Sequence, residues 1–451
     1  MPASPDRLAL LRCPACGSTL TEAEETLDCA ACEARFPTTG GVPWLYRDVA
    51  GSRAQWAAKL QRFRAELLAD LDALDASADR DDLVPSTRER LSRQRAGLER
   101  FGEQVMALLA PFALGHAEAG AVVPTDRIPS GQHVTSYLDT AYRDWSWGQA
   151  EIDETMQLVA PLASNAFARA LVLGGGAGRI SWELAATRPE ATVVQLDLNP
   201  LLTRIGALVA DGEPTTLTEL PRFPLSVEDA VVDHRLEAPH ESSKAPLFLL
   251  GDAFAPPFAE ETFDLLLTPW FVDIVPEAFP RLARRLARLL APGGRWVSFG
   301  PLSFERQDPA DRLTPEEVTD VLEIEGFEVL QAGTETVTYL HSPHAMPRRN
   351  EEIFAFEARR PETLADVDDF VFYPAWLTDG RTAIPADPGF ETLRAERTFD
   401  VEILKLIDGR ASIEDLVVIL SSRYGLAEDR ARATIDRFFA RWFEGEGGSS
   451  G

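Results

Sequence analysis

The central part of the chain alternates short apolar runs with amphipathic helical stretches. The apolar runs lie, in chain order, in ALVLGG, TVVQLD, FLLGD, FDLLLTP, RWVSF and FEVLQ. Short strands without polar positions are typical of a parallel sheet covered on both faces, and the helical stretches between them supply the crossover connections. We therefore predict an α/β, doubly wound, Rossmann-like domain. The stretch EEIFAFEARRP predicts a last edge strand with a proline stop, which ends this domain near Pro361.

Helical periodicity dominates the region before this domain. From residue 52 to about 114, apolar residues such as Trp56, Leu60 and Phe63 recur at helical spacing and predict two or three packed amphipathic helices. A stretch with Gly, Ala and Pro from 115 to 131 predicts a long connection. We expect four parts along the chain, with boundaries at 1–48, 52–134, 135–361 and 362–444.

The last part predicts a small helical unit. One apolar face of its first helix is made by Phe399, Ile403, Leu406 and Ile407. Asp408 and Gly409 predict a turn, Ser412 with Asp415 predicts the N-cap of a second helix, and Gly425 predicts the end of that helix. A third helix carries the apolar residues Ile435, Phe438, Phe439 and Trp442.

Charge and hydropathy exclude several classes of partner. The chain of 451 residues holds 44 Lys and Arg against 72 Asp and Glu, a net charge of −28, which repels the phosphate backbone of nucleic acids. No run of about 18 apolar residues occurs, and the first residues lack the apolar segment of a signal peptide. We therefore predict a cytoplasmic protein without a nucleic-acid or membrane partner. The final GEGGSSG has the composition of a flexible tail.

The cysteines predict a metal site near the amino terminus. Cys13 and Cys16 form one CxxC pair, Cys29 and Cys32 form a second, and the segment 17–28 separates the two pairs. Two such turns can complete a closed shell of four thiolates, which suits structural zinc. Two disulfides or a redox-active CxxC are the alternatives, and a reducing compartment and the absence of a βαβ context disfavour them.

The segment around these cysteines resembles a known module. It includes the Phe36 and Pro37 pair and the GVPWL sequence at 41–45, and over about 45 residues it resembles the small zinc-ribbon protein Trm112, which stabilises partner methyltransferases. The resemblance implies a protein-interaction module fused to the rest of the chain.

A glycine-rich turn follows the first strand of the α/β domain. Gly174, Gly176 and Gly178 allow a tight strand-to-helix turn and the close approach of a ligand to backbone. Asp197 ends the next strand, at the separation from this turn that nucleotide-binding folds use for a carboxylate that accepts both ribose hydroxyls. Arg179 stands where a dinucleotide fingerprint has its third glycine, so the spacing favours S-adenosylmethionine over NAD.

Later features fit the same cofactor. Asp252 and Ala253 follow the third strand, where the carboxylate can reach the adenine amino group, and Pro269 ends the fourth strand. The glycine turn at 291–294 precedes the fifth strand. This order and spacing is similar to the class I methyltransferase fold, which implies a ligand at the carboxyl ends of the strands. The alternative is a sheet whose glycines and acids only form turns and caps.

Three further segments resemble a narrower family. RDWS at 143–146, WFVD at 270–273 and PGGRWVSFGPL at 292–302 resemble the N2227-like family, which includes carnosine N-methyltransferase. The resemblance covers about residues 135–356. It implies that Arg143 holds the methionyl carboxylate of the cofactor, a bidentate role that suits guanidinium. The alternative for Arg143 is a surface cation beside Asp144.

The same resemblance implies an acceptor pocket. In that family an Asp, a His and two Tyr surround the imidazole that receives the methyl group, and Asp273 and Tyr339 match two of them. Glu305 replaces the His and Glu351 replaces the second Tyr, a departure that speaks against carnosine as the substrate. Three carboxylates would favour a cationic substrate and could raise one carboxyl pKa into the range of a base. The alternative leaves Glu305 and Glu351 in solvent.

The last helical unit resembles PqqD-like winged-helix domains, which bind leader peptides of ribosomally made natural products. The resemblance implies a peptide or protein partner docked along a strand edge. Residues 391–443 hold nine Lys and Arg and ten Asp and Glu, so no basic stripe supports DNA binding. A structural or dimerising role is the alternative.

These observations together predict an S-adenosylmethionine-dependent N-methyltransferase. We expect Asp273, Glu305, Tyr339 and Glu351 to act on an amine, imidazole or guanidine nitrogen of a small or peptidic substrate. The alternatives are a peptide-tailoring methyltransferase of a natural-product pathway, a non-catalytic scaffold with a methyltransferase fold, and an NAD-dependent oxidoreductase.

Overall fold

The computed structural model describes residues 5–114, 128–129, 131–162, 166–242, 244–306, 308–368, 381, 383, 386, 400–407 and 409–444. The chain divides into two compact units, Met1–Phe372 and Tyr373–Gly451, which are described in turn. The predicted connection at 115–131 lies almost entirely outside the described residues. None of the helices in the described ranges is long and apolar enough to cross a membrane.

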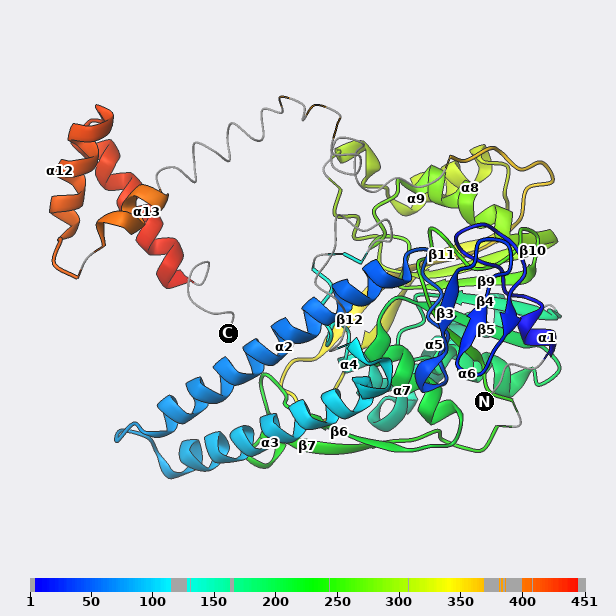
Figure 1. The fold of residues 1–451 in the computed structure, drawn as a ribbon, viewed down its shortest axis with the longest axis horizontal. Coiled ribbons are helices and arrows are strands. Elements are labelled where there is room, and N and C mark those ends of the chain that lie inside the picture. The colour runs from blue at the N-terminus through cyan, green and yellow to red at the C-terminus, as the bar shows by residue number, and fades with distance from the viewer. Residues whose placement is uncertain are drawn as a thin grey trace. The chain divides into compact units, whose positions relative to one another are not determined.

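A seven-stranded sheet forms the centre of the first unit, with the order β11-β12-β10-β9-β4-β5-β8 (Figure 1). The five parallel strands are β4 (Arg169–Leu173), β5 (Thr192–Asp197), β8 (Leu247–Leu250), β9 (Phe263–Pro269) and β10 (Leu290–Gly300). The two antiparallel strands are β11 (Glu328–Tyr339) and β12 (Arg349–Arg359). The predicted α/β fold with a largely parallel sheet is therefore confirmed.

The prediction that the last strand lies at the sheet edge is wrong. β12 pairs with β10 on one side and with β11 on the other. Residues 353–358 of β12 are all buried, whereas β11 is exposed along most of its length. A strand that is buried on both faces suits an interior position, where it pairs on each side, so the exposed β11 takes the edge position.

Five helices pack on the sheet and cover both of its faces, and all of them except α5, which precedes β4, connect its strands. They are α5 (Gln149–Leu162), α6 (Arg179–Thr187), α7 (Pro200–Ala210), α8 (Phe279–Leu289) and α9 (Pro315–Ile324). Alternate residues of β4 point to opposite faces. Leu171 and Leu173 belong to the core that includes Leu286 of α8, and Ala170 and Val172 belong to the core that includes Leu184 of α6.

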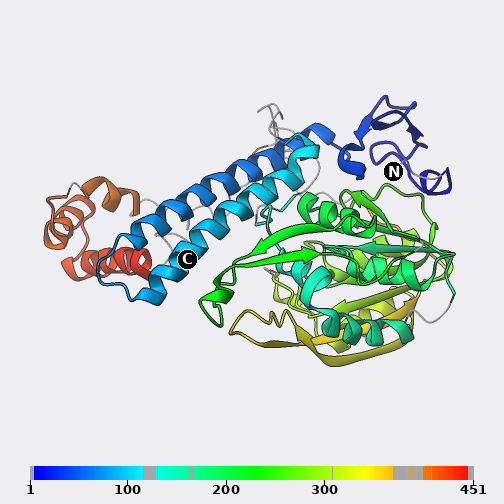
Figure 2. The ribbon, with the colours of Figure 1, turned by 90° about the horizontal axis from the view of Figure 1, so that it is seen from below.

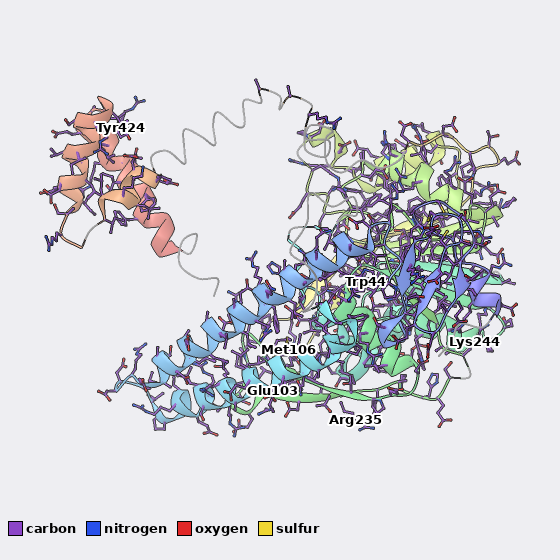
Figure 3. All side chains as sticks on the ribbon, in the orientation of Figure 1. Trp44, Glu103, Met106, Arg235, Lys244 and Tyr424 are labelled. Carbon is purple, nitrogen blue, oxygen red and sulfur yellow. The ribbon has the colours of Figure 1, made fainter. Side chains whose placement is uncertain are left out.

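The helical region before the sheet, for which two or three helices were predicted, contains two long helices that pack as an antiparallel pair, α2 (Val49–Ala78) and α3 (Pro85–Leu109). The buried residues of α2 all lie before residue 61, and Leu68 is 62% exposed. The far half of this pair therefore projects from the sheet as an arm (Figure 2). The base of α3 packs against α7 and against the hairpin of β6 (Thr215–Glu219) and β7 (Val232–Leu236), near Glu103 and Arg235 in Figure 3.

The cysteine-bearing segment packs directly on the sheet. After the short helix α1 (Pro5–Leu8), it forms the small antiparallel sheet of β1 (Thr21–Glu22), β2 (Thr26–Asp28) and β3 (Arg35–Pro37). Its buried residues Leu11 and Phe36 belong to the same core as Leu249 of β8. Residues 43–45 then run parallel to β8, because Leu45 N–H donates to the carbonyl of Leu250 and Leu250 N–H donates to that of Pro43.

The second unit is helical in its described residues. A helix at 400–406 precedes α12 (Ile413–Tyr424) and α13 (Glu428–Glu444). The predicted caps are confirmed, since Ser412 and Asp415 form a capping box and Gly425 ends α12 with φ 63°. Ile403 is buried in the core of this unit, but Ile407 is 48% exposed, so the predicted common face ends before it. The predicted Phe399, Asp408 and side chain of Trp442 lie outside the described residues.

A winged helix needs strands beside its helices, and the described residues of this unit contain none. The PqqD-like assignment therefore stays a prediction.

Candidate functional site

A cavity of about 480 Å³ lies at the carboxyl ends of β4, β5, β8 and β9, where a doubly wound sheet binds its ligand. Among the residues predicted for the site, those that line the cavity are Arg143, Gly174, Gly176, Asp197, Asp252, Ala253, Pro269, Asp273 and Tyr339. Gly178, Glu305 and Glu351 are not among its lining residues. Segments far apart in sequence thus meet at one edge of the sheet.

The glycine-rich turn between β4 and α6 needs its glycines for two reasons. Gly174, Gly176 and Gly178 all have positive φ, at 68°, 57° and 93°, which favours glycine. A Cβ atom on Gly178 would lie 2.4 Å from the ring of Phe248, and one on Gly174 would lie 2.8 Å from the ring of Phe271. Gly178 therefore serves the packing of the turn, and Gly174 and Gly176 offer bare backbone to the cavity.

Asp197 holds this turn against the end of β5. Its Oδ2 accepts the backbone N–H of Gly176 at 2.9 Å, and its Oδ1 accepts that of Asn199 at 2.8 Å. Burial raises the pKa of the Asp197 carboxyl, although these N–H groups oppose the shift. An ionised carboxylate has about four acceptor positions, so both oxygens can still accept ribose hydroxyls.

The chain after β8 forms the neighbouring wall. Asp252 Oδ1 accepts the backbone N–H of Phe254 at 2.9 Å, which fixes the turn, and Asp252, Ala253 and Phe254 line the cavity. The carboxylate and the adjoining apolar side chains suit a purine ring with an amino group.

Arg143 lies in a π-helical turn, Arg143–Trp147, that follows α4 (Asp139–Tyr142). Its Nε and Nη2 donate to Asp144 Oδ1 at 2.9 and 2.7 Å. The Arg143 side chain is only 14% exposed and Asp144 is buried, so Arg143 is no surface cation, although it does pair with Asp144. A guanidinium in this position fits the carboxylate of an amino-acid group.

The sequence did not predict the residue that fastens this turn to the glycine loop. Arg179 is 3% exposed, and it donates to the carbonyl of Asp144 at 2.5 Å and to Glu183 at 2.8 Å. Its guanidinium lies 5.5 Å from the ring of Trp145, whose Nε1 donates to the carbonyl of Ala177 at 2.8 Å. An arginine directly after the last loop glycine, with a glutamate one helical turn later, was the available sequence signal. Arg179 therefore holds the turn that carries Arg143 against the glycine loop.

The opposite side of the cavity offers one carboxylate and three aromatic rings. Asp273 is 4% exposed, its Oδ2 accepts the backbone N–H of Ser303 at 3.1 Å, and burial raises the pKa of its carboxyl. The rings of Trp270 and Tyr339 lie 4.3 Å apart, and Tyr137 lines the same cavity. These four side chains form a wall that can hold a flat or cationic acceptor group.

Two of these aromatic residues have unusual backbone conformations. Trp270 has φ 50° and Tyr137 has φ 61°, values in the left-handed region that bulky residues avoid. Gly300 permits the conformation of Trp270, since a Cβ atom there would lie 2.9 Å from Trp270 Cα. Strain of this kind is concentrated at functional sites. Trp270 begins the WFVD segment that carries the family resemblance, but neither Trp270 nor Tyr137 was predicted as a site residue.

The expected pocket of three carboxylates is not formed. Glu305 is exposed in the loop after β10. Glu351 pairs with Arg349 at 2.6 Å, and the guanidinium of Arg349 lies 4.5 Å from the ring of Tyr339. Glu351 is therefore held in an ion pair on β12. Of the three carboxylates predicted to be catalytic, only Asp273 lines the cavity.

The four cysteines form a cluster in the small amino-terminal sheet. Cys13 Sγ lies 3.6 Å from Cys32 Sγ, Cys16 Sγ lies 3.5 Å from Cys29 Sγ, and all four sulfur atoms lie within 4.8 Å of one another. The cysteines are free thiols, so no disulfide joins them. A tetrahedron with Zn–S bonds of about 2.3 Å has sulfur atoms about 3.8 Å apart, which the cluster fits.

Comparison with known proteins shows that the sequence is similar to methyltransferases. The family model described as carnosine N-methyltransferase matches residues 232–362. The carnosine N-methyltransferase of Schizosaccharomyces pombe is 23% identical over 252 residues, which cover 48% of this chain and 67% of that protein. The ubiquinone/menaquinone biosynthesis C-methyltransferase UbiE of Dinoroseobacter shibae is 30% identical over 143 residues, which cover 32% of this chain and 45% of that protein. The chain therefore spans less than half the length of this second relative.

Solved structures resemble the chain over about half of its length. The N-methyltransferase NodS of Bradyrhizobium japonicum is 14% identical with a TM-score of 0.32, and the match covers 47% of this chain and 98% of NodS. The PH0226 protein of Pyrococcus horikoshii is 14% identical with a TM-score of 0.35, and the match covers 50% of this chain and 97% of that protein. On these matches the chain is an S-adenosylmethionine-dependent methyltransferase, and residues 232–362 are similar to the carnosine N-methyltransferase family.

Proposed function

We propose that the protein transfers a methyl group from S-adenosylmethionine to a nitrogen atom of a small or peptidic acceptor. The observation that carries this proposal is the buried carboxylate of Asp273 in the cavity that the rings of Trp270 and Tyr339, Asp197 and the glycine turn also line. A buried acid among aromatic rings suits an amine, an imidazole or a guanidine better than an acidic or purely apolar acceptor.

We assign a separate part of the cofactor to each of three cavity residues. Asp197 would hold the ribose, Asp252 the adenine amino group and Arg143 the methionyl carboxylate, and the bound cofactor supplies a methyl group on a good leaving group. Displacement at carbon needs the acceptor lone pair aligned with the bond that breaks, so positioning contributes more than acid-base chemistry. The aromatic wall would orient the acceptor, and Asp273 would hold its N–H group.

Asp273 is also the residue able to take a proton. Backbone N–H groups hold the carboxylate, among them that of Ser303, which Oδ2 accepts. An ionised carboxylate has about four acceptor positions, so Oδ1 can still take a proton from the acceptor. Burial raises its pKa, so the carboxylate is a stronger base than an exposed one. The acceptor nitrogen forms one bond to the methyl carbon and loses one proton to Oδ1. Because the ionised form is the base, the rate should fall as the pH falls through the raised pKa.

The test uses full-length protein, S-adenosylmethionine with an isotopically labelled methyl group, and matched sets of acceptors. Amines, imidazoles and guanidines are compared with alcohols, thiols and activated carbon acceptors of similar size. We expect label only on nitrogen. Label on oxygen, sulfur or carbon with the best substrate would contradict the proposal.

Asp273→Asn keeps the shape of the side chain and the acceptor for Ser303 but removes the charge. We expect the kcat/KM for the nitrogen acceptor to fall about 100-fold, the lower end for loss of a general base, with unchanged affinity for S-adenosylhomocysteine. Glu305→Gln is the matched control, because Glu305 is exposed and does not line the cavity. Unchanged turnover in Asp273→Asn would remove the assigned role.

We further propose that Cys13, Cys16, Cys29 and Cys32 hold one structural zinc ion. The sulfur separations and the closed set of four thiolates support this assignment. Metal analysis of freshly purified protein should find about one zinc per chain, and clearly less than one would contradict it.

A further inference from the structure

Strand β11 is the exposed edge of the sheet, yet its last residue, Tyr339, lines the cavity. The strand is mostly exposed up to Thr336, Val337 is 7% exposed, and the ring of Tyr339 lies 4.3 Å from that of Trp270. An edge strand presents backbone N–H groups that no neighbouring strand accepts. The position of Tyr339 therefore depends on what holds this free edge.

Two glutamates of α5 accept the backbone N–H groups at this end of the strand. Glu154 Oε2 accepts that of Thr338 at 3.0 Å. Glu151 Oε2 accepts that of Leu340 at 2.9 Å, and Glu151 Oε1 accepts that of His341 at 2.7 Å. Residues three apart share one face of a helix, and alternate residues of a strand direct their N–H groups to one edge, so the two spacings match. The backbone is thus held by α5 on both sides of Tyr339.

Glu151 is the more tightly held of the two glutamates. It is 7% exposed, and both of its carboxylate oxygens accept a backbone N–H group, which replaces the water lost on burial. Leu340 has φ 51°, in the left-handed region that residues other than glycine rarely adopt. The bonds from Leu340 and His341 to Glu151 hold the chain in this conformation directly after Tyr339.

The helix that carries Glu151 is itself fixed to the glycine-rich turn. Gln149 is the first residue of α5, and its Oε1 accepts Nη2 of Arg179 at 2.7 Å. Arg179 begins α6 directly after the turn, and α5 packs against both α6 and β11. The position of Tyr339 relative to the cofactor turn is therefore set through α5.

We propose that Glu151 is a positioning residue that holds the ring of Tyr339 in the acceptor wall, an inference that rests on the proposed methyl transfer to nitrogen. Without the Glu151 carboxylate, the N–H groups of Leu340 and His341 lose their acceptor, and the strand end is free to move. The ring of Tyr339 is then no longer fixed against Trp270, and the acceptor loses part of its wall.

The first test observes Tyr339 itself, in full-length protein labelled with fluorotyrosine. The chain has six tyrosines, and the fluorine NMR signal of Tyr339 is the one that disappears in Tyr339→Phe. We expect Glu151→Gln to shift or broaden this signal, because its NH2 group must face one of two backbone N–H groups. In Glu154→Gln the amide oxygen can still accept Thr338, so the signal should stay in place. Glu103→Gln, at an exposed position of α3, is the control.

Kinetics test the consequence for the acceptor, with the amine, imidazole or guanidine that takes the most label in the methyl-transfer assay. In Glu151→Gln the KM for this acceptor should rise about 2- to 30-fold, the range of one contact between a cation and an aromatic ring, with little change in kcat. The affinity for S-adenosylhomocysteine should not change. In a Tyr339→Leu background, Glu151→Gln should add less than about twofold, because Glu151 acts through that ring.

Thermal unfolding shows whether each variant folds. If Glu151→Gln does not, Glu151→Met is the second variant, since an apolar side chain of similar length suits a buried position but accepts no hydrogen bond. An unmoved Tyr339 signal in the folded variant overturns the proposal. An equal shift in Glu154→Gln overturns it as well, because the effect then comes from lost charge alone, and so do fully additive effects of Glu151→Gln and Tyr339→Leu. If no nitrogen acceptor takes label, the proposed function fails, and the Tyr339 signal still decides the role of Glu151.

Discussion

Asp197→Asn is the most direct test of the cofactor site. Each carboxylate oxygen of Asp197 already accepts one backbone N–H group, from Gly176 and from Asn199. Asparagine keeps the shape but replaces one oxygen with an NH2 group, which would face one of these backbone donors. The substitution therefore removes the negative charge, one acceptor for a ribose hydroxyl and one bond that holds the glycine turn.

The magnitude follows from the lost hydrogen bond. A hydrogen bond to a charged acceptor contributes about 1.5 to 3 kcal/mol. Since every 1.4 kcal/mol corresponds to a factor of ten in affinity, the dissociation constant for S-adenosylhomocysteine should rise about 10- to 150-fold. The loosened turn would add to this effect rather than offset it.

The assay is calorimetric titration of S-adenosylhomocysteine into the wild type, Asp197→Asn and Asp211→Asn. Asp211 is an exposed residue at the end of α7 and serves as the matched control. Because burial raises the pKa of Asp197, the wild-type affinity should fall as the pH falls through that raised value, and Asp197→Asn should lack this acid limb. Affinities within twofold of each other, or the same acid limb in both proteins, would refute the reasoning.

Two further predictions concern the supports of the cavity. Gly178→Ala and Gly212→Ala both place Cβ at positive φ, but only at Gly178 does the new atom meet a ring, that of Phe248 at 2.4 Å. In urea unfolding we expect about 1 kcal/mol lost at Gly212 and about 2 kcal/mol more at Gly178, and equal losses would show that packing does not matter there. Removal of zinc by a chelator should weaken S-adenosylhomocysteine binding, because residues 43–45 pair with β8 beside the cavity; an unchanged titration would contradict this coupling.

The sheet was predictable because its strands carry their signal locally. Short, fully apolar runs such as 171–173 and 265–267, separated by helical stretches, are typical of strands inside a covered sheet. The hairpin of β6 and β7 was missed, since its strands mix polar and apolar residues and the long segment 220–231 joins them without a tight-turn pair. The interior position of β12 depends on its pairing with β10, which ends at Gly300 and is distant in sequence, and no local pattern fixes that pairing.

The residues of the candidate site differ in the same way in how far the sequence predicts their positions. Gly174, Gly176 and Asp197 lie at the ends of consecutive strands, so their meeting follows from the topology of the sheet alone. The positions of Glu305 and Glu351 depend on a loop conformation and on the pairing of Glu351 with Arg349. The role of Arg179 arises from its contact with Asp144, in a turn that precedes the whole of β4 in the sequence. Backbone topology is therefore the predictable part of this site, and side-chain direction is not.

The amino-terminal segment pairs with β8, the strand at the end of the sheet next to the cavity. β8 would otherwise be an edge strand with unpaired backbone groups next to the cavity. Residues 43–45 pair with it, Gly251 has no room for a Cβ because the carbonyl of Leu45 would lie 2.9 Å away, and the hydroxyl of Tyr46 donates to the carbonyl of Leu198 at 2.8 Å. Leu198 and Gly251 both line the cavity. The small sheet that carries the cysteine cluster leads into this segment, so we expect a change in the cluster to reach the cavity wall through these backbone contacts.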